Sequence, residues 1–386
     1  MLKKNIRVLL ASALFIVGAP VSAEWDEKKM AEKIDNLVSQ MTLEEKASMT
    51  SGRDAWSTQP IERLDIPYIW MADGPHGLRR APTTYLWGYG DQAPATCFPT
   101  ASALSATWDM DLLEEVGSAL GTEANALGVD LLLGPGINIK RSPLAGRNFE
   151  YFSEDPILSG KLGAAYINGV QSQGVGATAK HYVANNVETQ RMWANSNVDE
   201  RTLQEVYMTP FEIAVKKAQP WTVMACYNRV QGEYGTQSEF LLTDILKKDW
   251  GFKGIVVSDW FAVIDRVAAM KAGMHLEMPN VSPVNNAIAV EAIKNGELDI
   301  AVVDALVKEI LTVVFKAKSL QKEDVELNVE KDHAFARKVA SEAATLLKND
   351  NDVLPISKDK YKKVAIIGEF AVAPRYQGNG SSQVKP

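Results

Sequence analysis

Short apolar runs alternate along the chain with longer segments in which apolar residues recur every three or four positions. The short runs, bounded by glycine or proline, have the length of strands that are buried on both faces. The longer segments predict amphipathic helices, and regular alternation of the two predicts a parallel sheet. The expected strands cover residues 67–71, 128–133, 176–179, 222–225, 254–257 and 273–278, and the helices between them cover residues 109–127, 155–173, 200–218, 243–249, 262–272 and 284–294.

Six such units over about 300 residues favour an α/β fold of the (β/α)8 TIM-barrel type, with room for irregularity, over an open doubly wound sheet. A further helical stretch, residues 26–49, precedes the first strand, and Thr42 with Glu45 predicts a capping box within it. No GxGxxG motif follows an early strand, so a dinucleotide site has no support. In a barrel, catalytic side chains lie at the carboxyl ends of the strands.

The N-terminus has the pattern of a targeting segment. Lys3, Lys4 and Arg7 precede an apolar stretch at residues 8–17, and small residues end at Ala23. This pattern predicts a signal peptide over residues 1–23, cleaved after Ala23. The mature protein is then expected to be secreted or periplasmic, with no membrane partner, and an uncleaved anchor is the alternative.

The C-terminal part of the chain departs from the alternating pattern. We expect the barrel to cover residues 24–320 and a helical linker to cover residues 321–361. The apolar run at residues 363–368 predicts a new strand, and a lone strand needs a sheet to join. A second domain is therefore expected to begin at residue 362 and to be cut off at residue 386, with docking of this strand on the barrel edge as the alternative.

Composition excludes several classes of function. The net charge of -7 gives no basic surface, so nucleic acid is not an expected partner. Cys97 and Cys226 are the only cysteines, and export permits a disulfide, although their apolar surroundings suit buried free thiols equally well. With four histidines and no metal-ligand spacing, we expect no metal and no cofactor. The sequence carries no signal for the oligomeric state.

The run GIVVSDW at residues 254–260 ends an expected strand on a carboxylate and an indole. At the carboxyl end of a barrel strand, Asp259 is a candidate nucleophile toward a sugar, and Trp260 is a stacking platform. The alternative is that Asp259 caps the following helix, because aspartate is a common N-cap residue.

Polar side chains also follow the other expected strands. Each has a plain structural interpretation, such as a turn aspartate, an arginine paired with Glu150 or Glu154, a core histidine or a tyrosine at the core edge. Together they suit a neutral, hydroxyl-rich ligand, because carboxylates and cationic donors form strong hydrogen bonds with hydroxyl groups. The candidate binding residues are Asp73, Arg79, Arg147, Lys180, His181, Arg191, Tyr227 and Trp260.

These motifs resemble glycoside hydrolase family 3, the β-glucosidase family. The segments DGPHGLR, LLGPGINIKRSPLAGRNFEYFSEDP, KHYVANN with Arg191, ACYN and VVSDW follow that family's order and spacing. The resemblance covers nearly the whole mature chain. The closing GEFAVAPRYQGNGSSQVKP is similar to the start of the family's second domain, an α/β sandwich.

The resemblance implies a role for each candidate residue. Asp259 is the expected nucleophile of a retaining mechanism, Asp73 holds distal sugar hydroxyls, Tyr227 positions the nucleophile and Trp260 forms a wall. In the family, the general acid/base is a glutamate far downstream of the barrel, so none is assigned within this chain. The residues expected around the −1 subsite are Arg79, Arg147, Lys180, His181 and Arg191.

The expected function is therefore that of an exported retaining exo-β-glucosidase acting on a small β-glucoside or oligosaccharide. A β-xylosidase or arabinosidase of the same family and a non-hydrolytic glycan-binding fragment are the alternatives. The sequence VANNVETQR after Lys180 and His181 argues against the branch that cleaves N-acetylglucosaminides. His275 stands where most relatives have an aspartate, which makes the hydrogen bonding around residues 273–279 a question for the structure.

Overall fold

The computed structural model describes residues 26–81, 92–280 and 283–386, so the expected signal peptide lies outside the described residues. A five-stranded parallel sheet forms the centre of the molecule, in the order β1-β2-β3-β5-β8. Every residue of these five strands is buried, as the glycine-bounded apolar runs predict. The strands are β1 Met71–Ala72, β2 Leu131–Leu132, β3 Gly176–Tyr182, β5 Thr222–Ala225 and β8 Ile255–Ser258.

The sheet curls, and single bridges rather than further strands continue it. Leu276 forms an isolated parallel bridge with Val257 of β8, and Glu277 forms another with Ser51. An antiparallel bridge between Ser57 and Trp70 lies immediately before β1. The described residues therefore form a barrel-like domain with five regular parallel strands. The expected strand at residues 273–278 is therefore wrong, because only single bridges form there, whereas the curled parallel sheet is consistent with the expected barrel-type fold and its irregularity.

A small second sheet lies on the carboxyl side of the main sheet. In it, β4 Asn195–Ser196 pairs in parallel with β6 Arg229–Val230. The strand β6 also pairs with β7 Glu233–Tyr234 in a hairpin. This sheet attaches the loop that follows β3 to the loop that follows β5.

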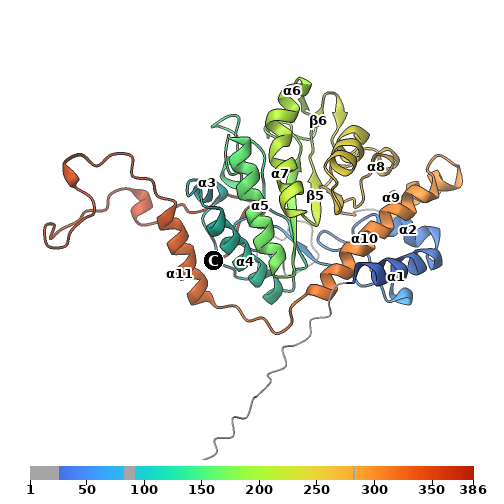
Figure 1. Ribbon diagram of the computed structural model, residues 1–386, viewed down its shortest axis with the longest axis horizontal. Coiled ribbons are helices and arrows are strands. Elements are labelled where there is room, and N and C mark those ends of the chain that lie inside the picture. Colours follow the sequence, from blue (N-terminus) through green and yellow to red (C-terminus); the bar gives the residue numbers. More distant parts are fainter. Residues whose placement is uncertain (1–25, 82–91, 281–282) are drawn as a thin grey trace, which may run out of the picture.

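Helices surround the sheet at the positions that periodicity predicts, and aspartates cap many of them. Figure 1 shows α4, α5 and α7 side by side on one side of the sheet, with α1, α2, α9 and α10 grouped at the other end. Thr42 and Glu45 form the predicted capping box at the start of α2. The helices are α1 Glu27–Gln40, α2 Leu43–Met49, α3 Ala101–Ser105, α4 Met110–Ala126, α5 Pro156–Ser172, α6 Glu200–Thr202, α7 Thr209–Ala218, α8 Arg266–Ala272, α9 Pro283–Lys294, α10 Ile300–Leu320 and α11 Val329–Glu342, with π-helical turns over Leu203–Met208 and Phe240–Asp249.

His275 joins the sheet to α10. Its Nδ1 accepts a hydrogen bond from the backbone N–H of Val256 at 3.1 Å, and its Nε2 lies 2.9 Å from Oε2 of Glu309. Burial lowers the pKa of His275, so the neutral ring accepts at Nδ1 and donates from Nε2. The histidine thus satisfies a buried backbone group and a carboxylate that also pairs with Lys247.

The C-terminal segment does not contain the expected strand. Residues 363–368 are exposed and have no strand partner, with Ile366 and Ile367 at 78% and 91% exposure. A strand needs the edge of a sheet, and among the described residues no edge lies against this segment. The chain then returns to the barrel, where the backbone N–H of Ala95 donates to the carbonyl of Lys385 at 3.0 Å and Val384 is buried.

Three further findings concern the thiols, the helices and the possible metal ligands of the described residues. Cys97 and Cys226 are both free, and burial raises the pKa of the two thiols to about 11 and about 12. None of the described helices combines the length and apolarity that a membrane crossing needs. In the same part of the chain, no group of three His, Cys, Asp or Glu side chains is arranged to hold a metal ion.

Glu123 of α4 makes stability depend on pH. Its Oε1 accepts a hydrogen bond from the backbone N–H of Thr96 at 2.9 Å, and the residue is 2% exposed. Burial raises the pKa of this carboxyl to about 7, against the effect of the Thr96 hydrogen bond. Between pH 4.5 and 7 the folded protein therefore binds more protons than the unfolded chain, and the free energy of unfolding falls as pH rises.

Glu123→Gln should remove this dependence. We expect the variant to exceed the wild type in stability by up to about 3 kcal/mol at pH 8 and to differ little at pH 4, because the neutral amide needs no ionisation in the core. Urea unfolding at the two pH values measures the difference. Glu115→Gln, an exposed position on the same helix, is the control. Equal pH dependence of stability in all three proteins would contradict the assignment.

Candidate active site

The turn after β1 brings a carboxylate and two cations together. Gly74 has a φ of 121°, and a Cβ there would lie 1.9 Å from the carbonyl oxygen of Gly77, so the turn requires glycine. The turn closes with a hydrogen bond from the backbone N–H of Arg79 to the carbonyl of Asp73 at 2.9 Å. The Asp73 carboxylate then lies 3.4 Å from Arg79 Nη1 and 3.6 Å from Lys180 Nζ.

The end of β3 holds His181 in one protonation state and one orientation. Asn138 accepts from the backbone N–H of His181 at 2.6 Å, and Arg147 Nη2 lies 2.7 Å from His181 Nε2. Burial lowers the pKa of His181 well below its usual value, and the neighbouring Arg147 and Lys180 lower it further. Since a guanidinium can only donate, Nε2 of the neutral ring accepts from Arg147, and Nδ1 carries the proton toward Tyr151 Oη at 3.1 Å.

Asp259 lies at the carboxyl end of β8, as the GIVVSDW run predicts. Its backbone N–H donates to the carbonyl of Ala225, and its Oδ1 accepts from the backbone N–H of Trp260 at 2.7 Å. Oδ2 lies 3.6 Å from His181 Nε2. Asp259 does not cap the next helix, because Asp265 caps α8 by accepting from Ala268.

Opposing effects set the ionisation of Asp259. Burial raises its pKa above the usual value, whereas Arg147, Arg191 and a hydrogen bond from Tyr227 lower it. Arg191 lies over the ring of Tyr227 at 4.4 Å, which keeps both side chains beside the carboxylate. These donors favour the anionic form that a nucleophile requires.

Two indoles form the apolar side of the site. The Trp260 ring lies 5.6 Å from that of Trp56, and Trp260 Nε1 donates to the carbonyl of Ala55 at 2.9 Å. This hydrogen bond fixes the ring that follows the candidate nucleophile. Apolar rings beside charged donors match the two faces of a sugar, whose C–H groups stack while its hydroxyls form hydrogen bonds.

All nine residues singled out from the sequence line one cavity of about 140 Å³ at the carboxyl ends of the strands. The rest of the lining, which the sequence did not indicate, consists of Trp56, Met224 and Ser381. Trp56 precedes the first strand, Met224 lies within the buried strand β5, and Ser381 belongs to the glycine-rich tail. Of the two expected partners of Arg147, Glu150 and not Glu154 forms the ion pair. Glu188 pairs with Arg191 at 2.9 Å and lies 3.9 Å from Arg147.

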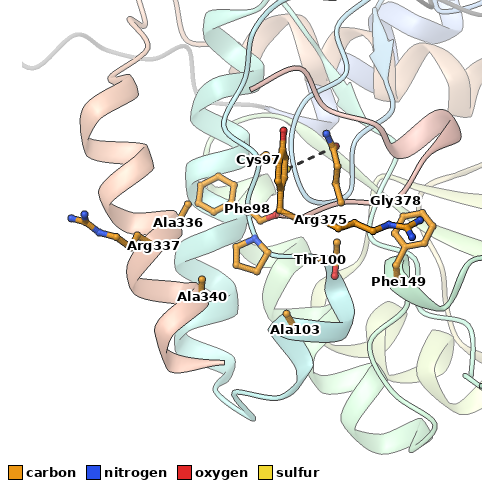
Figure 2. A pocket seen from close by; sticks show the side chains of 13 residues that line it. Cys97, Phe98, Thr100, Ala103, Phe149, Ala336, Arg337, Ala340, Arg375 and Gly378 are labelled. Atoms are coloured by element: carbon orange, nitrogen blue, oxygen red, sulfur yellow. Dashed lines mark hydrogen bonds between the residues drawn. The ribbon is translucent and has the colours of Figure 1, made fainter. Parts of the chain in front are cut away.

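A larger cavity of about 670 Å³ lies between α11, the start of α3 and the C-terminal tail. Figure 2 shows Phe98, Ala103, Phe149 and Ala336 around it, with Arg337 and Arg375 as its charged side chains. Among the described residues that line it there is no carboxylate and no histidine. The thiol of Cys97 lines the larger cavity, but burial raises its pKa to about 11, so the carboxylates and the histidine of the smaller cavity make that cavity the candidate active site.

Comparison with known proteins identifies the family. The sequence model of the glycosyl hydrolase family 3 N-terminal domain matches residues 21–313, and that of the family's C-terminal domain matches residues 344–386. The chain belongs to glycosyl hydrolase family 3. The match to the N-terminal domain includes every strand of the main sheet and all nine predicted site residues.

The proteins that are similar to this chain include glycosidases named for different substrates. Thermostable β-glucosidase B of Acetivibrio thermocellus is 51% identical over 92% of this chain and 47% of that protein. An exo-α-(1→6)-L-arabinopyranosidase of Bifidobacterium longum is 44% identical over 92% of this chain and 48% of that protein. The solved structure of β-glucosidase 3B from Thermotoga neapolitana in complex with glucose matches with a TM-score of 0.85 and 40% identity, over 92% of this chain and 52% of that chain. The chain thus spans about half the length of the curated relatives it matches.

Proposed function

We propose that this family 3 chain is the barrel of a retaining exo-β-glucosidase. The observation that carries the proposal is Asp259, a buried carboxylate flanked by Arg147, Arg191 and Tyr227 in a cavity walled by indoles. The β-glucosidases among the similar proteins support a glucoside as the substrate. The cavity binds one terminal sugar, and its charged donors hold the hydroxyls.

The proposed reaction has two displacements. Asp259 Oδ2 attacks the anomeric carbon, a bond forms between them, and the bond from that carbon to the leaving oxygen breaks. The leaving oxygen takes a proton from a general acid. Water then attacks the same carbon, gives its proton to the resulting base and releases Asp259 as the carboxylate.

The general acid/base is proposed to come from outside the barrel. A retaining mechanism needs a second carboxyl about 5–5.5 Å from the nucleophile. In the described part of the chain, Asp73, Glu150 and Glu188 near Asp259 are each in ion pairs with arginine or lysine. A carboxylate held by cations is a poor proton donor. These three carboxylates are therefore proposed to bind the substrate or to orient the cationic side chains around it, and not to act as the general acid.

A panel of nitrophenyl glycosides tests the substrate class. We expect the complete protein to hydrolyse the β-D-glucoside with the highest kcat/KM and to release the β-anomer of glucose first. The arabinopyranosidase among the relatives makes pentosides the second candidate. Highest kcat/KM for the α-L-arabinopyranoside or β-D-xyloside would replace the glucosidase assignment, and binding of glucose without release of nitrophenol would favour a glycan-binding role.

Export is proposed on the charged and apolar pattern of the first 23 residues. Expression with these residues should give a secreted or periplasmic protein whose N-terminus is Glu24. Edman sequencing of the exported protein measures this end directly. Recovery of the uncleaved chain in a membrane fraction would instead support an anchor.

A further inference from the structure

Trp193 is a large apolar side chain that the fold leaves exposed. Its relative exposure is 63%, although its backbone is held on both sides. The N–H of Trp193 donates to the carbonyl of Gln190 at 2.7 Å, and its carbonyl accepts from Arg229 Nη2 at 3.0 Å. The next residues form β4, which pairs with β6. The indole thus projects from a fixed turn.

The same turn supplies charged groups to the active-site cavity. Arg191, two residues before Trp193, lines the cavity and stacks on Tyr227. Glu188 binds Arg191 and reaches toward Arg147. Arg229, which holds the carbonyl of Trp193, follows Tyr227 by two residues. The turn that carries Trp193 therefore borders the cavity at Arg191 and Tyr227, although Trp193 itself does not line the cavity; we call this border the rim.

The size of the cavity determines what reaches this rim. At about 140 Å³, with Asp259 buried in it, the cavity suits a single sugar unit. The remainder of any longer substrate must leave through the rim. Exposed tryptophan on a fixed backbone presents a rigid apolar face at little entropic cost, and such faces stack with sugar rings and aromatic groups.

We propose that Trp193 is an acceptor-side platform that stacks with the second sugar of an oligosaccharide or with an aromatic aglycone. The proposal rests on the glucosidase function inferred above. It assigns to Trp193 the preference for the leaving group, whereas the cavity residues select the terminal sugar.

The test compares two substrates that share the terminal glucose. β-D-Glucosyl fluoride places a single atom on the acceptor side, and cellotriose places two sugars there. In the complete protein, Trp193→Ala should lower kcat/KM for cellotriose about tenfold, the value of one good stacking contact. It should leave the turnover of glucosyl fluoride unchanged, and Trp193→Phe should retain most of the cellotriose activity.

Trp108 offers a matched control, because it is 72% exposed and lies before α4, outside the cavity lining. Trp108→Ala should change neither substrate. Unchanged cellotriose kinetics in Trp193→Ala would overturn the proposal, as would an equal loss on both substrates, which would place the effect at Arg191. If the wild type turned over neither substrate, the glucosidase function would fail instead, and calorimetric binding of cellotriose to Trp193→Ala would still decide the role of Trp193.

Discussion

Asp259→Ala should reduce hydrolysis of an aryl β-glucoside by the complete protein on the order of 10⁴- to 10⁶-fold, as loss of a nucleophile does in other enzymes. The expected cause is that, in the part of the chain that the structure describes, the other carboxylates near Asp259 (Asp73, Glu150 and Glu188) are held in ion pairs by arginine or lysine. The loss should fall on kcat, while a competitive sugar still binds. Steady-state kinetics with calorimetry of glucose binding measures both quantities.

A small external anion provides a positive readout for the same variant. Azide can enter the space that the shortened side chain leaves and attack the anomeric carbon of a glucoside with a good leaving group. The expected product is the α-glucosyl azide, because one displacement inverts the configuration. In the wild type, a 2-deoxy-2-fluoro glucoside should label Asp259, which peptide mass spectrometry can locate.

Asp249→Asn is the control, because Asp249 is an exposed aspartate on the π-helical segment before β8. It should retain wild-type kinetics. Label on any residue other than Asp259, or full activity in Asp259→Ala, would remove the basis for the proposed mechanism.

Asp73→Asn should produce the second largest loss. If the Asp73 carboxylate accepts two sugar hydroxyls, each charge-assisted bond is worth about 1.5–3 kcal/mol, so kcat/KM should fall on the order of 10²- to 10⁴-fold. The variant also removes the carboxylate that pairs with buried Arg79 and Lys180, which lowers stability. Kinetics and thermal unfolding should therefore be measured together.

A substrate lacking one distal hydroxyl separates binding from stability. The 4-deoxy glucoside should lose rate in the wild type but lose much less in Asp73→Asn, because the bond is already absent. Asp130→Asn is the matched control. The Oδ1 atom of Asp130 lies 2.7 Å from Nζ of Lys318, and Asp130 does not line the cavity. This variant should lower stability and leave kcat/KM unchanged. Equal losses for the 4-deoxy substrate in wild type and Asp73→Asn would show that Asp73 does not bind that hydroxyl.

Local sequence patterns predicted the elements whose form depends on their own residues. The strand over residues 222–225 was predicted with its observed bounds, and that at 254–257 shifts by one residue. Strands buried on both faces appear as uninterrupted apolar runs, and helix starts carry caps such as Asp109 and Asp155. The side chains that follow these strands were recognised for the same reason, since strand ends in a parallel sheet share one edge.

Local sequence patterns did not predict contacts between segments that are distant in the sequence. The position of Ser381 in the cavity depends on the return of the tail to the barrel, and Trp56 reaches the site because a loop bridges to Trp70. The apolar run at residues 363–368 has the composition of a strand but no strand partner among the described residues. Composition alone therefore predicted a strand that does not form.

The sequence by itself determined the parallel α/β architecture, the caps and the polar residues at the strand ends, because burial and backbone hydrogen bonding follow local periodicity. Only the tertiary structure decided how the curled sheet continues through single bridges, that Arg147 pairs with Glu150, and that His181 is a neutral acceptor for Arg147. These features depend on which side chains meet after folding and on how deeply they are buried, and neither is encoded in the spacing of residues along the chain.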